Sequence, residues 1–91
     1  MTYRIAATKH FEKDVKRCIK RGFDMEKLKT AIRLLETAGH LPAQYKPHKL
    51  SGKYSGQWEC HLQPDWLLVW IQNDDQLLLT MTNTGTHSDV F

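Results

Sequence analysis

Four residues in the second half of the chain can carry acid–base chemistry near neutral pH: His48, His61, Asp65 and His87. An imidazole titrates close to neutrality, so a histidine can serve as a general base or a general acid. Aspartate is a poor base unless its pKa is shifted, but it can orient an imidazole or accept a proton from one. These residues are candidates for a catalytic cluster, although each histidine can equally be a surface or hydrogen-bonded structural residue.

The spacing of these residues does not favour a metal site. His61 and Asp65 would share one face of a helix, but Pro64 and the alternating sequence before it argue against a helix there. No second close pair of ligands exists, and neither His10 nor His40 has acidic or aromatic company that suggests a site. The sequence therefore predicts neither a metal nor another cofactor.

Cleavage of RNA is the reaction that best uses this set of side chains. A base must remove the proton of the 2′-hydroxyl, donors must stabilise the charge on the phosphate oxygens, and an acid must protonate the departing 5′-oxygen. Lysines around His48 can hold phosphates, and aromatic rings can stack an unpaired base. The candidate substrate-binding residues are Lys46, Lys49, Lys53, Trp66 and Phe91, of which Trp66 can equally belong to the core.

The basic residues are confined to one part of the chain. The formal net charge is +3, yet all 13 lysines and arginines lie between Arg4 and Lys53. Five acids and no basic residue follow Lys53, apart from the histidines. This asymmetry fits either two solvated helices or a surface that attracts a polyanion or an acidic protein.

Length and composition set the broad class. A chain of 91 residues has room for one core, so we expect a single domain over residues 1–91. No apolar run approaches the roughly 20 residues of a membrane span, and the first residues lack the apolar stretch of a secretory signal. We therefore expect a cytoplasmic protein without a membrane partner. Cys18 and Cys60 match no zinc or redox spacing and are expected to be small buried side chains.

The first half of the chain predicts one strand and two amphipathic helices. Residues 2–7 form the strand, Thr8 caps the first helix, and Gly22 follows its end. Asp24 caps the second helix, which ends at Gly39. Each helix carries one apolar stripe at helical spacing. The stripe residues are Phe11, Val15, Cys18 and Ile19 on the first helix, and Leu28, Ala31, Ile32 and Leu35 on the second.

The second half predicts an antiparallel meander of strands at residues 57–62, 66–71 and 76–83, with turns at 63–65 and 73–75. Alternation assigns Trp58, Cys60 and Leu62 to one face of the first of these strands, and Glu59 and His61 to the other. Residues 40–56 are expected to form a loop, with room for a short strand near residues 48–50. The predicted fold is α+β: an N-terminal strand and a two-helix hairpin packed on one face of a mainly antiparallel four-stranded sheet.

Three segments of the chain resemble one known family. YKPHKLSGKYSG, CHLQPDWLLVW and TGTHSDVF are similar to the characteristic segments of YafQ-type toxins, which belong to the RelE/ParE superfamily of bacterial toxin–antitoxin systems. The pattern HxxPDW followed by a TGTHxxxF ending is specific, and the predicted order of strands and helices also matches the RelE-like fold. The family's functional positions correspond to His48, His61, Asp65, Trp66, His87 and Phe91, all of which are present.

The resemblance implies a ribosome-dependent endoribonuclease that cuts messenger RNA in the ribosomal A site and inhibits translation. It also implies a cognate antitoxin of the DinJ/RelB type that neutralises the toxin, and operator DNA contacted only through the toxin–antitoxin complex. Under this hypothesis His48 or Asp65 is the base and His87 is the acid, or the acid and base assignments are exchanged, while His61 orients Asp65 or contacts phosphate. Two alternatives remain: a ParE-like non-catalytic toxin that binds gyrase, and a passive RNA-binding module.

Overall fold

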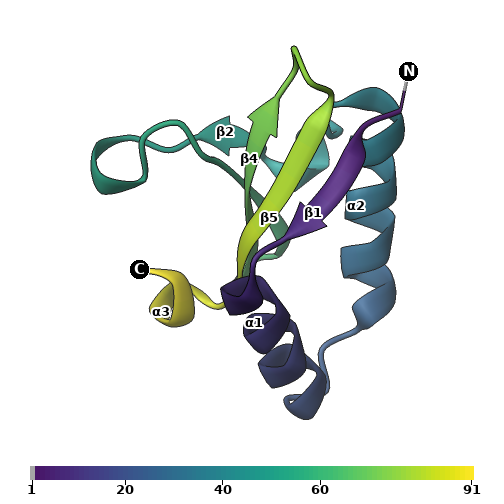
Figure 1. Ribbon diagram of the computed structural model, residues 1–91. Coiled ribbons are helices and arrows are strands. Elements are labelled where there is room, and N and C mark those ends of the chain that lie inside the picture. The colour runs from purple at the N-terminus through teal and green to yellow at the C-terminus, as the bar shows by residue number, and fades with distance from the viewer. Residues whose placement is uncertain (1) are drawn as a thin grey trace.

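The structure is a computed structural model that describes residues 2–91. Two long helices lie on one side of a sheet, and a short C-terminal helix lies on the other side (Figure 1). In chain order the elements are β1 (Arg4–Ala7), α1 (Lys9–Lys20), α2 (Met25–Ala38), η1 (Ala43–Tyr45), β2 (His48–Lys49), η2 (Gly52–Tyr54), β3 (Trp58–Gln63), β4 (Trp66–Asn73), β5 (Leu78–Gly85) and α3 (His87–Val90).

The sheet has five strands in the order β1-β5-β4-β3-β2. β1 runs parallel to β5, and the three other pairs are antiparallel. The α+β fold and the predominantly antiparallel sheet are thus confirmed, whereas the predicted number of four strands is wrong. The fifth strand is β2, a two-residue edge strand that pairs with β3 in the region expected to be mainly loop.

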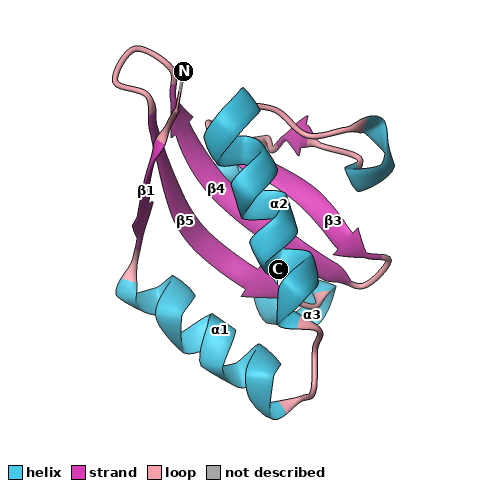
Figure 2. Cartoon of the chain, turned by 90° about the vertical axis from the view of Figure 1, so that its right-hand side faces the viewer, coloured by secondary structure: helices cyan, strands magenta, loops and turns pink. Residues whose placement is uncertain are grey.

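The predicted signals at the helix ends are confirmed. The Thr8 hydroxyl accepts a hydrogen bond from the backbone N–H of Phe11, and the Asp24 carboxylate caps α2. Gly39 ends α2 with a φ of 73°, the left-handed conformation that glycine adopts without strain. Along its length α2 packs across one face of the sheet, as Figure 2 shows.

The predicted buried stripe of α1 is only partly correct. Phe11 and Cys18 are buried, but Ile19 is 55% exposed, and Asp14 is buried in its place. The side chain of Asp14 contacts His10 and Arg17, with the His10 Nε2 atom at 3.3 Å, so His10 does have an acidic neighbour. The helical spacing alone could not distinguish Asp14 from an exposed residue, because a carboxylate is buried only where partners are present.

The core lies on both faces of β4. Every residue of β4 from Trp66 to Trp70 is buried, which confirms the prediction of a central strand. The larger cluster lies under α1 and α2, and both free cysteines are buried within it. Burial raises the pKa of Cys60 to about 12, so this thiol is a packing group. On the opposite face, Leu67 and Val69 pack against Val90 and Leu50.

Candidate active site

The strand register brings the predicted site residues to one face of the sheet. His48 on β2 is paired with Glu59 on β3, and directly paired residues share a face. Leu67 of β4 is paired with His61 on one side and with Gly85 of β5 on the other. The end of β5 therefore lies only two strands from His61.

The chain then turns so that His87 meets Asp65. Gly85 has a φ of 152°, and Thr86 caps α3 with a hydroxyl that accepts from the backbone N–H of Asp89. The backbone N–H of His87 donates to the Asp65 carboxylate at 2.9 Å, and its ring Nδ1 lies 2.6 Å from the same oxygen. These two hydrogen bonds, that of the backbone first, hold the pKa of Asp65 below its usual value.

His61 lies beside both other imidazoles. Its ring centroid is 5.7 Å from that of His87 and 6.4 Å from that of His48. His61 does not contact Asp65 in any hydrogen bond or ion pair of residues 2–91; its Nε2 instead faces Glu59 at 3.8 Å. The expected orientation of Asp65 by His61 is therefore wrong, because His87 occupies that position.

Glu59 is a member of the cluster that the sequence analysis did not select. Its Oε1 lies 3.2 Å from His48 Nε2, and its side chain is only 5% exposed. The other oxygen, Oε2, is buried without a hydrogen-bond partner. The carboxylate between the two imidazoles can accept a hydrogen bond from either ring. The available signal was its position two residues before His61, on the same face of a mostly apolar strand.

The three candidate lysines are placed differently. Lys49 is paired with Trp58, so it lies on the face opposite His48, with its Nζ 5.6 Å from the Trp58 ring. This orientation argues against a phosphate contact in the cluster. Lys46 stays near the site, because it lines a surface hollow together with His61. Lys53 lies over the ring of Tyr54, next to the C-terminal segment.

The two candidate aromatic residues also differ. Trp66 is 1% exposed, packs against Phe23 with ring centroids 4.9 Å apart, and donates from Nε1 to the Thr84 hydroxyl. Its expected stacking role does not fit this buried position. Phe91 is 56% exposed and packs edge-on against Tyr54, not on His87. An exposed aromatic ring one helical turn after His87 is suited to stacking on a base.

Two surface hollows open beside His61. One, of about 490 Å³, is lined by the first turns of α2 and by η1; the other, of about 320 Å³, is lined by Lys46 and the β3–β4 turn. Within residues 2–91 no group of three or more histidine, cysteine or acidic side chains is arranged to hold a metal ion. The imidazoles and carboxylates of the cluster are side chains that can transfer protons and contact phosphate.

The fold and the cluster define a small α+β domain with histidine–carboxylate pairs on one face of its sheet, and comparison with known proteins specifies the family. Residues 3–91 match the model of YafQ, the bacterial toxin of type II toxin–antitoxin systems, so the chain belongs to the YafQ family. It is 43% identical over 82 residues to the mRNA interferase toxin YafQ of Escherichia coli strain K12, covering 89% of this chain and 87% of the relative.

Solved structures agree with this assignment. The structure is similar to the toxin in the crystal structure of the E. coli DinJ–YafQ toxin–antitoxin complex, with a TM-score of 0.90, 39% identity and coverage of 100% and 99% of the two chains. It is also similar to a metal-bound toxin from Helicobacter pylori, with a TM-score of 0.88, 37% identity and full coverage of both chains.

Proposed function

We propose that this protein is a ribosome-dependent endoribonuclease that cuts messenger RNA in the ribosomal A site and thereby inhibits translation. The observation that carries the proposal is the cluster in which His61 lies between a His48–Glu59 pair and a His87–Asp65 pair. The relative named an mRNA interferase supports the same reaction. Because the proposed reaction takes place on ribosomes, we infer that the protein acts in the cytoplasm.

His87 is the general acid of the proposed reaction. Asp65 can only accept, so Nδ1 of His87 donates to it and Nε2 is left for the substrate. The carboxylate orients the ring, and the protonated imidazole gives its Nε2 proton to the departing 5′-oxygen. Asp65 itself is a poor base, because its lowered pKa reduces its affinity for a proton.

His48 is the general base. Its Nδ1 lies 2.9 Å from the carbonyl oxygen of Lys46 and therefore donates, which leaves the lone pair on Nε2. The ring is 49% exposed, so the 2′-hydroxyl can approach Nε2 from the open side. Once Nε2 has taken the proton, both ring nitrogens donate to oxygens already in place, those of Lys46 and Glu59. His61 lies between base and acid and contacts the phosphate.

The products report this chemistry directly. Attack by the 2′-oxygen leaves a 2′,3′-cyclic phosphate on the upstream fragment and a 5′-hydroxyl on the downstream fragment. A messenger with a 2′-deoxy nucleotide at the cleavage position should therefore resist cutting. Cleavage of the deoxy substrate at the normal rate would refute attack by the 2′-oxygen.

The need for the ribosome follows from the small number of phosphate donors. With Lys49 on the opposite face, Lys46 and Lys53 are the candidate lysines left near the cluster. Positioning of the RNA backbone must then come from ribosomal RNA. Naked messenger and a translating extract should be compared at equal toxin concentration. Equal cleavage of the two would contradict this part of the proposal, and binding without any cleavage would favour a passive RNA-binding module.

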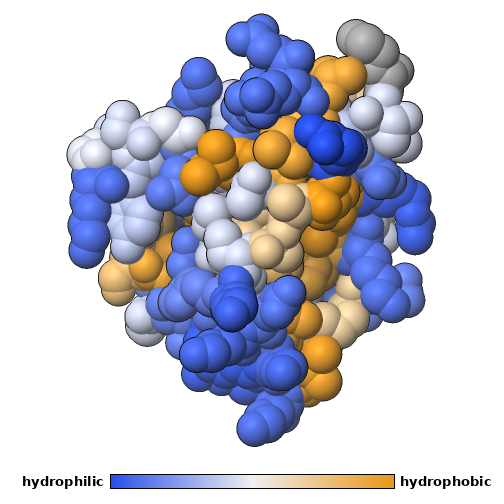
Figure 3. Space-filling view, viewed as in Figure 1, coloured by the Kyte–Doolittle hydropathy of each residue, from blue (hydrophilic) through white to orange (hydrophobic). Residues whose placement is uncertain are grey.

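The proposed partner is a cognate antitoxin of the DinJ/RelB type, through which the complex reaches operator DNA. The E. coli DinJ–YafQ complex supports this choice. Hydrophilic side chains cover the α1 end of the molecule (Figure 3), and α1 carries much of the basic charge. Affinity for an acidic antitoxin segment should therefore decrease as salt increases. An affinity independent of salt would indicate an apolar interface instead.

A further inference from the structure

Helix α1 is tied to the catalytic C-terminal segment by ion pairs. Asp89 lies in α3, two residues after His87, and its Oδ2 is 2.6 Å from Nη1 of Arg21. Nε of Arg17 lies 3.7 Å from the same oxygen. The Asp89 side chain is 15% exposed and that of Arg21 is 43% exposed, so these contacts are only partly shielded from water.

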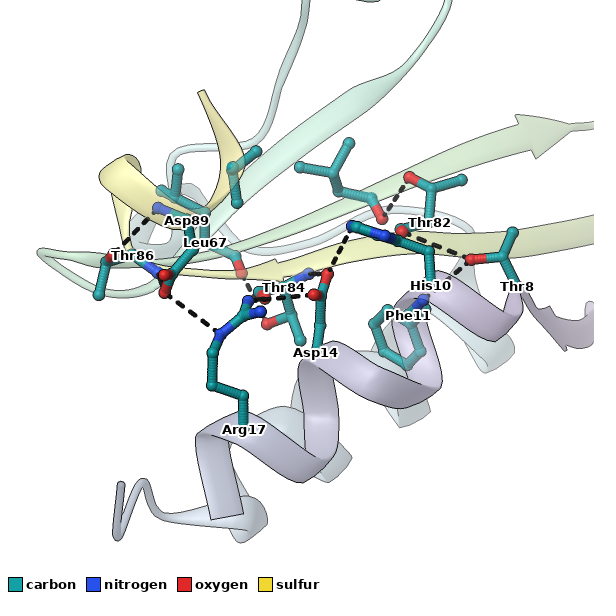
Figure 4. Close-up of polar contacts among 12 residues, drawn as sticks. Thr8, His10, Phe11, Asp14, Arg17, Leu67, Thr82, Thr84, Thr86 and Asp89 are labelled. Carbon is teal, nitrogen blue, oxygen red and sulfur yellow. Dashed lines mark hydrogen bonds and ion pairs between the residues drawn. The ribbon is translucent and has the colours of Figure 1, made fainter. Parts of the chain in front are cut away.

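Arg17, a residue of α1, also contacts a second residue of α1 and the backbone of β5. Its Nη2 lies 3.0 Å from Oδ1 of Asp14 and donates to the Thr84 carbonyl at 3.2 Å. The buried Asp14 also accepts from the backbone N–H of Thr84. Figure 4 shows these side chains converging where α1 meets the end of β5. We refer to Asp14, Arg17, Arg21 and Asp89 as the α1–α3 latch.

The latch contacts the turn before α3, where the backbone has little conformational freedom. Oδ2 of Asp89 also accepts from the backbone N–H of Thr86, which completes the capping box of α3. A Cβ at Gly85 would lie 2.8 Å from the Asp89 side chain and 3.0 Å from Nη2 of Arg17. The approach of the latch to the turn before His87 thus depends on the absence of a side chain at residue 85.

The short helix α3 must be stabilised by tertiary contacts. A four-residue helix is far too short to be stable alone, because helix formation has a costly nucleus. His87 is the first residue of α3, and a displacement of about 1 Å in a catalytic group can cost roughly 10²-fold in rate. The orientation of His87 therefore depends on what holds the rest of α3.

We propose that Arg21, with Arg17, is a positioning residue for RNA cleavage: the arginines hold Asp89, and through α3 they keep His87 against Asp65. The proposal rests on the proposed role of His87 in the reaction. It assigns a function to two cations of the α1 region that would otherwise be counted among the residues attracting RNA or an antitoxin.

The competing explanation is that Arg21 contacts ribosomal RNA directly. Two substitutions that change the net charge of the protein in opposite directions separate the two explanations. Arg21→Met lowers the formal net charge of +3 by one unit, whereas Asp89→Asn raises it by one unit. If Arg21 acts by attracting RNA, only Arg21→Met weakens the enzyme. If the latch positions His87, both variants lose rate.

The experiment measures steady-state cleavage on programmed ribosomes for wild type, Arg21→Met, Arg21→Lys, Asp89→Asn and Lys20→Met. The asparagine in Asp89→Asn retains a side-chain oxygen that can cap α3, so only the charge is removed. Lys20→Met is the matched control, since Lys20 is a neighbouring cation of α1 with no ion pair among residues 2–91. Arg21→Met and Asp89→Asn should lower kcat by about tenfold with little change in KM. Arg21→Lys should recover part of the loss, and Lys20→Met should leave kcat unchanged.

A second measurement needs no RNA. The backbone N–H of His87 donates to Asp65, so its hydrogen exchange reports whether His87 is in place. It should exchange faster in Arg21→Met and Asp89→Asn, but not in Lys20→Met. Wild-type exchange of His87 in both latch variants would overturn the proposal, as would a loss of kcat confined to Arg21→Met. A wild-type protein that cuts nothing would overturn the proposed function, and the exchange data would still decide on the latch.

Discussion

Replacing Asp89 with asparagine removes the charge of the α1–α3 latch while keeping an oxygen for the cap of α3. The hydrogen bond from Arg21, followed by that from the backbone of Thr86, lowers the pKa of Asp89 from 3.8 to about 2. Each pKa unit corresponds to about 1.4 kcal/mol of preference for the charged form in the folded state. Solvent screening reduces this figure, because the Arg21 side chain is 43% exposed, so at neutral pH Asp89→Asn should lower the free energy of unfolding by about 1 kcal/mol, or Tm by roughly 5 °C.

The pH dependence of this loss has a definite sign. The pKa of Asp89 is lower in the folded state, so its charge stabilises the protein above the unfolded-state pKa of about 3.8. This stabilisation is lost as the pH falls through the folded-state pKa of about 2. The difference between wild type and Asp89→Asn should accordingly be constant above about pH 5 and disappear between about pH 4 and 2.

Urea unfolding of both proteins from about pH 7 to about pH 2, followed by circular dichroism, measures this difference. Other carboxylates titrate in the same range, but they are common to both proteins and cancel in the comparison. Lys20→Met serves as the control for removal of a charge near α3 without removal of an ion pair. A difference that stays the same at every pH would show that asparagine fails in capping or packing, and that the ion pairs contribute little.

Three further substitutions test the cluster and its surroundings. Asp65→Asn should slow cleavage roughly 10²-fold or more, with an unchanged circular dichroism spectrum; wild-type rates would make Asp65 structural. Deletion of Phe91 should reduce cleavage while Tm falls by only a few degrees, since the ring is 56% exposed; a large fall in Tm with normal cutting at low temperature would indicate a plug. Trp66→Phe should lower the free energy of unfolding by about 1–3 kcal/mol without raising KM, since it removes a buried hydrogen bond to Thr84. A raised KM with an unchanged Tm would instead restore the stacking role of Trp66.

Local signals made most of the fold predictable from the sequence. Thr8 and Gly39 mark helix ends through hydrogen bonding and backbone freedom that depend on their own residue type. The continuous apolar run of β4 predicts a strand buried on both faces, as observed. The strand β2 was less predictable, because two residues are too few to show alternation and the pairing with β3 is a tertiary contact.

The site was only partly predictable, because residue type does not specify which partners are near. His48 and His87 were selected for their chemistry and through the family resemblance. No local pattern indicates that Asp65 receives His87 and not His61, since that choice depends on the turn after Gly85. For Trp66 the residue type suggested a role that burial does not allow. A tryptophan can stack on a base, but this residue is only 1% exposed.

The largest differences between the sequence predictions and the structure concern charged residues, and they have one physical reason. A pattern of apolar spacing treats every carboxylate as exposed, and the cost of burying one justifies this in general. Asp14 and Glu59 are nevertheless almost fully buried, because Arg17 and the backbone of Thr84 hold the first, and two imidazoles face the second. Buried carboxylates of this kind can be recognised only after the fold has brought their partners together.

Different parts of the chain hold α3 in different ways. Asp65 binds its first residue, the latch binds Asp89, and the apolar side chain of Val90 packs against Leu67 and Val69 while its carbonyl accepts from Tyr54. Each contact is of modest strength, and only together do they order a segment with no helical stability of its own. The proposed catalytic position of His87 therefore depends on α1, β4 and the segment around Tyr54 all being folded. We expect a toxin built in this way to lose activity when one of these contacts opens locally, well before the main core under α1 and α2 unfolds.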